Sequence, residues 1–299
     1  MSAPLAPRYW PVWIGFGFLY LWHLLPWPVA MAAGRRLGGL LRLGLKSRVK
    51  VTRRNLELCF PEATEAEREQ MLKETFESVG CMLPEAGFAW FGSQRRINRL
   101  SSVTGTEYLD QAQAEGQGVL LLAAHFTTLE IGGRIICRHD KESKAAIYRE
   151  HSNPALEYLV RKYRSGYAGT CFNRNETRGA VRHLRRGRLL WYAPDQDYER
   201  GQSLFLPFFG IQAYTSTSAH QLATLGRARV LTVRQRRTRQ GYELAIEPPL
   251  AGIPGPNVEE DCARINEVME RIIREAPTQY LWLHRRFKNR PEGEASLYG

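Results

Sequence analysis

Short apolar runs alternate with helical patterns through the last two thirds of the chain. Strand-like segments cover residues 118–124, 145–148, 189–193, 228–234 and 242–247. Segments with helical spacing of their apolar positions cover residues 129–137, 154–163, 177–186, 216–225 and 258–276. Strands that alternate with helices predict an α/β sandwich, with a mainly parallel central sheet flanked by helices.

A core-facing helix is predicted ahead of this region, from about residue 61 onward. Its first turn is acidic, which suits the positive end of the helix dipole. Its apolar positions then recur at helical spacing, at Met71, Leu72, Phe76, Val79 and Leu83. The alternating α/β region therefore follows at least one long helix.

The first 34 residues predict a membrane anchor, which leaves residues 35–299 as a separate globular domain. Residues 9–34 contain no Asp, Glu, Lys or Arg, and a stretch of that length can span a bilayer. Pro26 and Pro28 are expected to break or kink its far end. The alternative is a buried or interfacial helix. The positive-inside rule places the domain in the cytoplasm, because cations lie mainly on the carboxyl side of the stretch. Only Arg8 precedes the stretch, whereas the cations that follow it are Arg35, Arg36, Arg42, Lys46, Arg48, Lys50, Arg53 and Arg54.

Composition and charge limit the classes of molecule that the chain is expected to bind. A chain of 299 residues with 43% hydrophobic content can bury a substantial core. The net charge of +12 indicates an anionic partner, such as an acidic lipid surface, an acidic carrier protein or nucleic acid. The five cysteines show no metal-binding spacing, and no nucleotide-binding loop or GxSxG elbow is present. No cofactor or metal is therefore expected, and nucleic acid is disfavoured because no recognition module appears.

His125 and Glu130 follow the apolar run 118–124, at the expected mouth of a buried strand. Ligands of α/β proteins usually bind beyond the carboxyl ends of the strands. Regular helix geometry prevents the two side chains from sharing a face, so His125 must precede a helix with Glu130 in its first turn. A carboxylate on one ring nitrogen would leave the other nitrogen free to act as a base. The alternative is a capping box, with Thr127 as the cap and Glu130 reaching back to it.

Other strand ends add polar residues to the same predicted edge. Tyr148 and Arg149 follow one strand, and Asp195 and Asp197 follow another. Taken one at a time, a salt bridge for Arg149 and a turn or a helix cap for the aspartates are simpler interpretations. Residues 213–218 predict a hydroxyl-rich helix start. An apolar segment before it either lines a ligand channel or packs in the core: Phe205, Pro207, Phe208 and Phe209.

Six segments, taken together, resemble the bacterial late acyltransferases of lipid A biosynthesis. The resemblance runs nearly end to end, over residues 8–10, 54–61, 76–80, 125–134, 191–198 and 282–293. It implies a fold similar to glycerolipid acyltransferases and a place on the cytoplasmic face of the bacterial inner membrane. It also implies transfer of a fatty acyl chain, lauroyl or similar, from acyl carrier protein to a hydroxyl on the acyl chains of Kdo-bearing lipid IVA.

The resemblance also assigns site residues. The family's H-x-x-x-x-D/E pair falls on His125 and Glu130, which implies that Glu130 orients His125 as a general base without a covalent intermediate. The arginine of its Tyr-Arg segment is Arg149, a candidate oxyanion donor. The aspartate of its Ala-Pro-Asp segment is Asp195, expected to orient a neighbouring cation or the acceptor.

The implied partners are acyl carrier protein, the lipid A precursor and anionic inner-membrane lipids. Candidate docking cations for them lie in three groups, at residues 182–188, 234–239 and 284–290. Two other functions stay open. One is an acyl-CoA-dependent glycerolipid acyltransferase, and the other is a noncatalytic membrane lipid-binding protein.

Overall fold

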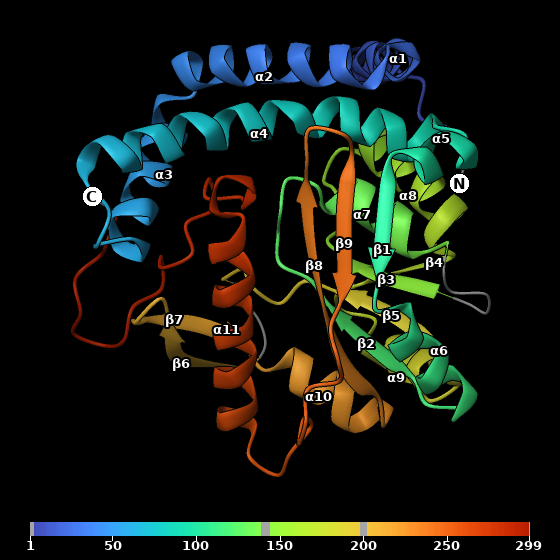
Figure 1. Cartoon of the computed structure of the whole chain (residues 1–299), viewed down its shortest axis with the longest axis vertical. Coiled ribbons are helices and arrows are strands. Elements are labelled where there is room, and N and C mark those ends of the chain that lie inside the picture. The colour runs from blue at the N-terminus through green and yellow to red at the C-terminus, as the bar shows by residue number, and fades with distance from the viewer. Residues whose placement is uncertain (1–2, 139–143, 198–201, 299) are drawn as a thin grey trace.

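A seven-stranded sheet forms the centre of the computed structural model, which describes residues 3–138, 144–197 and 202–298 (Figure 1). The strand order is β1-β9-β8-β2-β5-β3-β4. The strands are β1 (Ser101–Thr104), β2 (Val119–Leu122), β3 (Lys144–Tyr148), β4 (Thr170–Asn173), β5 (Leu189–Tyr192), β8 (Arg229–Arg237) and β9 (Tyr242–Ile246). The five strands from β8 to β4 run parallel, whereas β9 is antiparallel to β8. The predicted α/β fold with a mainly parallel sheet is confirmed.

The two central strands are apolar because both faces of the sheet are covered. Every residue of β2 and β5 is buried. Alternate residues of a strand point to opposite faces. Leu120 and Leu190 accordingly join one hydrophobic cluster, and Leu121 and Trp191 join the other. The continuous apolar runs in the sequence therefore report a strand buried on both sides.

Helices cover the two faces. On one face lie α9 (Thr177–Leu184), α10 (Ser218–Gly226) and α11 (Val258–Glu275). On the other lie α6 (Thr106–Ala114) and α7 (Leu129–Ile136), with α8 (Pro154–Ala168) beside α7. The helix α5 (Gln94–Arg99) precedes β1. Each expected strand and helix beyond residue 100 appears within a few residues of its predicted bounds, except the helix start at residues 213–218.

That helix start and the apolar segment before it form a hairpin instead. Strands β6 (Ser203–Phe208) and β7 (Ile211–Ser216) pair antiparallel. The turn uses Phe209 and Gly210, both with positive φ, as in the type I′ turns of two-residue hairpins. Phe208 and Phe209 are buried and pack against Phe287 and Trp282, respectively. For these two side chains the structure shows core packing.

The N-terminal region consists of two helices rather than one continuous helix. After a short 3-10 turn at Pro7–Tyr9, α1 (Trp10–Leu24) stops before Pro26, and α2 (Trp27–Gly44) starts with Pro28 in its first turn. The predicted break at the prolines is confirmed, and the expected membrane-spanning helix is not. None of the helices in the described residues has both the length and the apolar character needed to cross a membrane. The anchoring role of residues 1–34 stays a prediction.

Helix α2 lies along α4 (Glu65–Phe91), and α3 (Lys46–Cys59) connects the two (Figure 1). The backbones approach closely at Gly38 and Gly80. A Cβ on Gly38 would lie 2.0 Å from the carbonyl oxygen of Phe76, so a larger residue there would force the helices apart. The predicted helix from residue 61 corresponds to α4, which starts with a capping box between Thr64 and Glu67.

Candidate functional site

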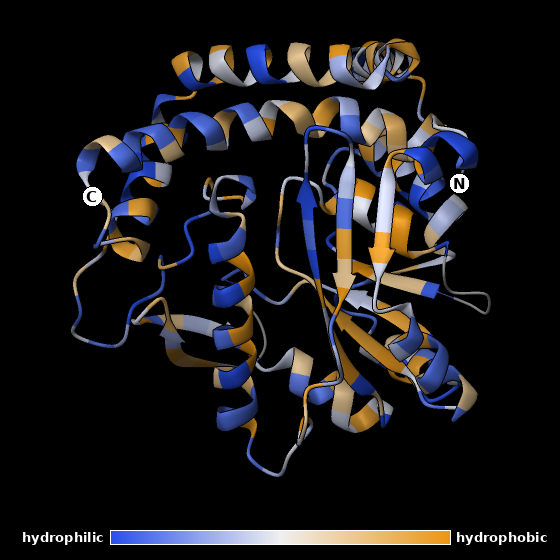
Figure 2. Cartoon of the chain, viewed as in Figure 1, coloured by the Kyte–Doolittle hydropathy of each residue, from blue (hydrophilic) through white to orange (hydrophobic). Residues whose placement is uncertain are grey.

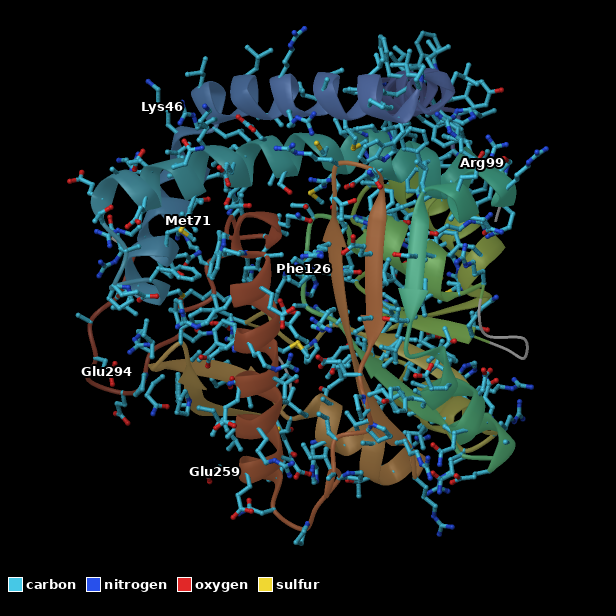
Figure 3. All side chains as sticks on the ribbon, viewed as in Figure 1. Lys46, Met71, Arg99, Phe126, Glu259 and Glu294 are labelled. Carbon is cyan, nitrogen blue, oxygen red and sulfur yellow. The ribbon has the colours of Figure 1, made fainter. Side chains whose placement is uncertain are left out.

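His125 lies on the loop between β2 and α7, at the carboxyl edge of the sheet. The C-terminal segment fixes this loop as an added strand would. The Thr127 amide donates to the Gln279 carbonyl at 2.8 Å, and the Leu281 amide donates to the His125 carbonyl at 3.0 Å. Between them, Phe126 pairs antiparallel with Tyr280 (Figure 3 labels Phe126). The backbone of the candidate base is therefore held in place by residues more than 150 positions away.

The carboxylate at the His125 ring belongs to Asp195. This residue follows β5, the strand next to β2. Its Oδ1 lies 2.7 Å from His125 Nδ1, its Oδ2 accepts the His125 amide at 3.0 Å, and the Tyr280 hydroxyl donates to Oδ2 at 2.8 Å. The Asp195 side chain is fully buried.

Asp195 is ionised in this environment. Burial alone would raise its pKa, but the charge of His125 and the hydrogen bonds from His125 and Tyr280 outweigh burial and lower the pKa to about 2. An ionised carboxylate only accepts hydrogen bonds, so His125 Nδ1 carries the proton. The Nε2 lone pair is then the basic position, and the side chain remains 19% exposed. The geometry is that of an oriented general base.

Glu130 lies in the first turn of α7, as expected, but it does not orient His125. Its carboxylate accepts hydrogen bonds from Trp90 Nε1 at 2.7 Å, the Tyr167 hydroxyl at 2.6 Å and the Arg164 guanidinium, whose Nε lies 2.9 Å from Oε2. Burial raises the pKa of Glu130, but the charge of Arg164 and these hydrogen bonds reverse the effect and lower it. The expected pairing of Glu130 with His125 is wrong, because α4 and α8 supply its donors.

The capping-box alternative is also wrong. The N-cap residue of α7 is Thr128, and no side chain caps the helix. Thr127 Oγ1 lies instead 2.7 Å from Ser78 Oγ on α4, within reach of Arg237. The Thr127 side chain therefore ties the His125 loop to α4.

Arg149 follows β3, at the same sheet edge as His125 and Asp195, because β2, β5 and β3 are parallel neighbours. The Arg149 side chain is exposed. The backbone around it is fixed by Glu157 of α8, which accepts the Tyr148 hydroxyl at 2.5 Å and the His151 amide at 3.0 Å. The predicted clustering of these residues at one edge is confirmed for position, and their chemical roles stay predictions.

Two of the predicted docking groups contain cations that are buried in the protein. Arg237 Nε donates to Glu85 at 2.5 Å, and both side chains are buried. Arg286 is buried and donates to the Tyr214 carbonyl at 2.8 Å. These two arginines cannot meet a docking protein. Arg182, Arg185 and Arg186 are exposed near the amino end of β5, at the edge opposite Asp195.

The C-terminal segment supplies two further site residues, of which the sequence had pointed only to His284, through the resemblance and a basic group. Tyr280 contacts Asp195, and the His284 ring accepts the Asp197 amide at 3.2 Å. His284 opens the basic group 284–290, whereas no spacing in the sequence marks Tyr280. In the described residues no group of three His, Cys, Asp or Glu side chains could hold a metal ion.

Comparisons with known proteins identify the family of the chain. Residues 2–289 match the family model described as "Bacterial lipid A biosynthesis acyltransferase". Two relatives from Escherichia coli (strain K12) are each 42% identical to the chain. They are a lipid A biosynthesis palmitoleoyltransferase, over 98% of this chain and 96% of the relative, and a lipid A biosynthesis lauroyltransferase, over 99% and 97%. A lipid A biosynthesis myristoyltransferase from the same strain is 27% identical, over 98% of this chain and 91% of the relative.

Proposed function

The chain belongs to the bacterial lipid A biosynthesis acyltransferases, and from that premise we propose its donor, acceptor and mechanism. The protein transfers a fatty acyl chain, lauroyl or similar, from acyl carrier protein to a hydroxyl on an acyl chain of Kdo-bearing lipid IVA. His125 is the general base, and Asp195 orients it. The observation that carries this proposal is the 2.7 Å hydrogen bond between the His125 and Asp195 side chains at the carboxyl edge of the sheet.

The proposed reaction needs no acyl-enzyme. The acceptor hydroxyl gives its proton to Nε2 of His125 while its oxygen bonds to the thioester carbonyl carbon. Collapse of the tetrahedral intermediate then breaks the carbon–sulfur bond, and the proton on His125 passes to the departing sulfur. The products are an ester and the free carrier thiol. General base assistance contributes about 10²- to 10⁴-fold, so positioning and oxyanion stabilisation must supply the rest.

The N-terminal helices support an interfacial attachment to the cytoplasmic face of the inner membrane. Figure 2 shows hydrophobic residues along α1, at one end of the molecule. Large apolar side chains on α1 and α2 are more than half exposed, among them Trp10, Ile14, Phe18, Leu21, Leu24, Val29, Leu40 and Leu43. Apolar side chains that lie in a headgroup region, with Arg and Lys nearby, bind anionic lipids. This attachment replaces the spanning helix in the proposal.

His125→Asn tests the function. Asparagine keeps a donor near Nδ1 for Asp195 but has no basic nitrogen in place of Nε2. We expect transfer from lauroyl carrier protein to fall at least about 10²-fold, with lipid binding retained. Mass spectrometry of the lipid products measures the rate of acyl transfer. Coenzyme A thioesters and carrier-protein donors of several chain lengths are offered in parallel, so that the same experiment identifies the donor.

His220→Asn is the matched control. The Nδ1 of His220 lies 2.8 Å from Asp261, between α10 and α11, in a second His–Asp pair outside the site. This variant should keep transfer close to the wild-type rate. Equal activity of His125→Asn and the wild type would reject the mechanism. A wild type that uses only coenzyme A thioesters would favour the glycerolipid acyltransferase, and one that binds lipid without any transfer would favour the noncatalytic alternative.

A further inference from the structure

His284 is a second histidine beside the candidate base, and contacts fix it from two sides. Its backbone carbonyl accepts Asn55 Nδ2 at 2.8 Å, and its amide donates to the Leu281 carbonyl at 3.3 Å. Its ring nitrogen Nε2 accepts the backbone amide of Asp197 at 3.2 Å. The position and rotation of this imidazole are therefore set by α3 and by the loop that follows β5.

Asp197 is itself held in place, which makes its amide a fixed donor. Its Oδ1 accepts Asn289 Nδ2 at 2.7 Å, and its Oδ2 accepts the Asn289 amide at 3.2 Å. Asp195 and Asp197 thus have different tasks. Asp195 uses its side chain to orient His125, and Asp197 uses its backbone to orient His284.

The Asp197 contact determines which nitrogen of His284 carries the proton. A nitrogen that accepts a hydrogen bond is unprotonated, so the proton of the neutral ring is on Nδ1. Burial, the charge of His125 and the charges of Arg286 and Lys288 favour the neutral ring over the opposing effect of Asp195, and they lower the pKa of His284 to about 4. At pH 7 the ring is a neutral N–H donor. No described group accepts its Nδ1 proton.

The same two segments hold both histidines. Leu281 donates its amide to the His125 carbonyl and accepts the His284 amide with its own carbonyl. On the other side, both rings contact the 195–197 turn. Among the described residues nothing occupies the Nε2 lone pair of His125 or the Nδ1–H of His284. An acceptor and a donor beside each other are what a hydroxyl attacking a carbonyl requires.

We propose that His284 is a further catalytic residue, whose Nδ1–H donates a hydrogen bond to the thioester carbonyl oxygen as the tetrahedral oxyanion forms. The inference rests on the proposed function. A neutral donor suits this position, because a cationic ring would repel the imidazolium that forms on His125 when it takes the acceptor proton. The bond strengthens as negative charge develops on oxygen. It therefore lowers the activation barrier and leaves the affinity for the substrate nearly unchanged.

Two substitutions at His284 separate catalysis from structure. In His284→Asn the side-chain amide replaces Nδ1–H but cannot accept the Asp197 amide. In His284→Gln the side-chain oxygen can accept the Asp197 amide, but no donor remains near Nδ1. We expect kcat to fall about 10²- to 10³-fold in His284→Gln, with an unchanged KM for the acyl donor. His284→Asn should lose about 10-fold at most.

A structural role would reverse this order, so a kcat of His284→Gln equal to or above that of His284→Asn overturns the proposal. A second measurement does not depend on activity. Long-range 1H–15N spectra of the full-length protein with 15N-labelled histidine should show His284 neutral at pH 7 with its proton on Nδ1. A charged ring, or a proton on Nε2, also overturns it. A wild type without transfer activity would reject the proposed function and this role together, whereas wild-type transfer with the reversed order would reject only the role of His284.

Discussion

Two carboxylates lie close to His125 in sequence or in space, the fully buried Asp195 and Glu130, whose side chain is 15% exposed, and their hydrogen-bond partners differ. Asp195 binds an imidazole whose second nitrogen has no partner within the part of the chain that the structure describes, together with the Tyr280 hydroxyl. Glu130 binds a guanidinium, together with the Tyr167 hydroxyl and the Trp90 indole. A guanidinium keeps its proton at any physiological pH, whereas an imidazole can exchange one. The hydrogen-bond partner of each carboxylate, rather than the carboxylate itself, therefore determines which of the two regions can transfer a proton.

The Glu130 side chain links the helices beside the site. Its donors come from α4 and α8, and its own helix is α7, so one side chain joins three helices. Helix α8 also carries Glu157, which fixes the backbone on both sides of Arg149. We therefore propose that Glu130 positions the edge of the site, whereas Asp195 contacts the proposed base.

Neutral isosteres at the two carboxylates should give the largest difference. In Asp195→Asn the amide can donate to His125 Nδ1, which moves the ring proton to Nε2 and removes the base. We expect kcat to fall about 10³- to 10⁴-fold. Glu130→Gln keeps the ring of His125 oriented, so its kcat should fall less than about 10-fold. Single-turnover acyl transfer measures both, and equal losses would contradict the division of roles.

The sequence predicted the sheet because β2 and β5 are apolar throughout and the helices between the strands are amphipathic. It did not predict the hairpin β6–β7, whose residues were interpreted as an apolar channel-lining or core segment and a helix start. Local apolar pattern does not reveal that Phe209 and Gly210 adopt positive φ, and this turn is what makes the two segments pair.

The site was predicted in position but not in pairing. His125, Arg149 and Asp195 could be placed at one edge because parallel strands end together. Glu130 was assigned to His125 because it is near in sequence, while its partners Trp90 and Arg164 belong to other helices. The roles of Tyr280 and His284 depend on a C-terminal segment that returns to the His125 loop, and no spacing rule reports such a contact.

The stability of the protein should depend strongly on the ion pair of Glu130. Arg164→Met leaves the Glu130 carboxylate buried without its cation, so the free energy of unfolding should fall by about 3–5 kcal/mol. The matched control is Arg236→Met, which breaks an ion pair with Glu243 in which the side chains are 59% and 47% exposed. That loss should be at most about 1 kcal/mol. Urea unfolding of both variants in the same detergent gives the two losses of unfolding free energy. Similar losses would show that Glu130 does not hold the three helices together.

Matched tyrosines give the smallest and most specific test, because Tyr280 donates to Asp195 and Tyr167 donates to Glu130. Replacing either by phenylalanine should cost about 1–3 kcal/mol of stability, since each removes a hydrogen bond to an ionised group. The pKa of Asp195, about 2, lies below its ordinary value of 3.8, so its stabilising effect is present above that value and is lost as the pH falls through about 2.

Tyr280→Phe removes one of the hydrogen bonds that lower this pKa, so acid unfolding should begin at a higher pH than in the wild type. A more basic Asp195 also holds the Nδ1 proton more firmly, so the acid limb of the pH–rate profile should move to higher pH, with less than about a 10-fold change in kcat. Tyr167→Phe should leave the profile in place, because Glu130 does not contact His125. A shift of the same size in both variants would mean that the two carboxylates act on the base as one network.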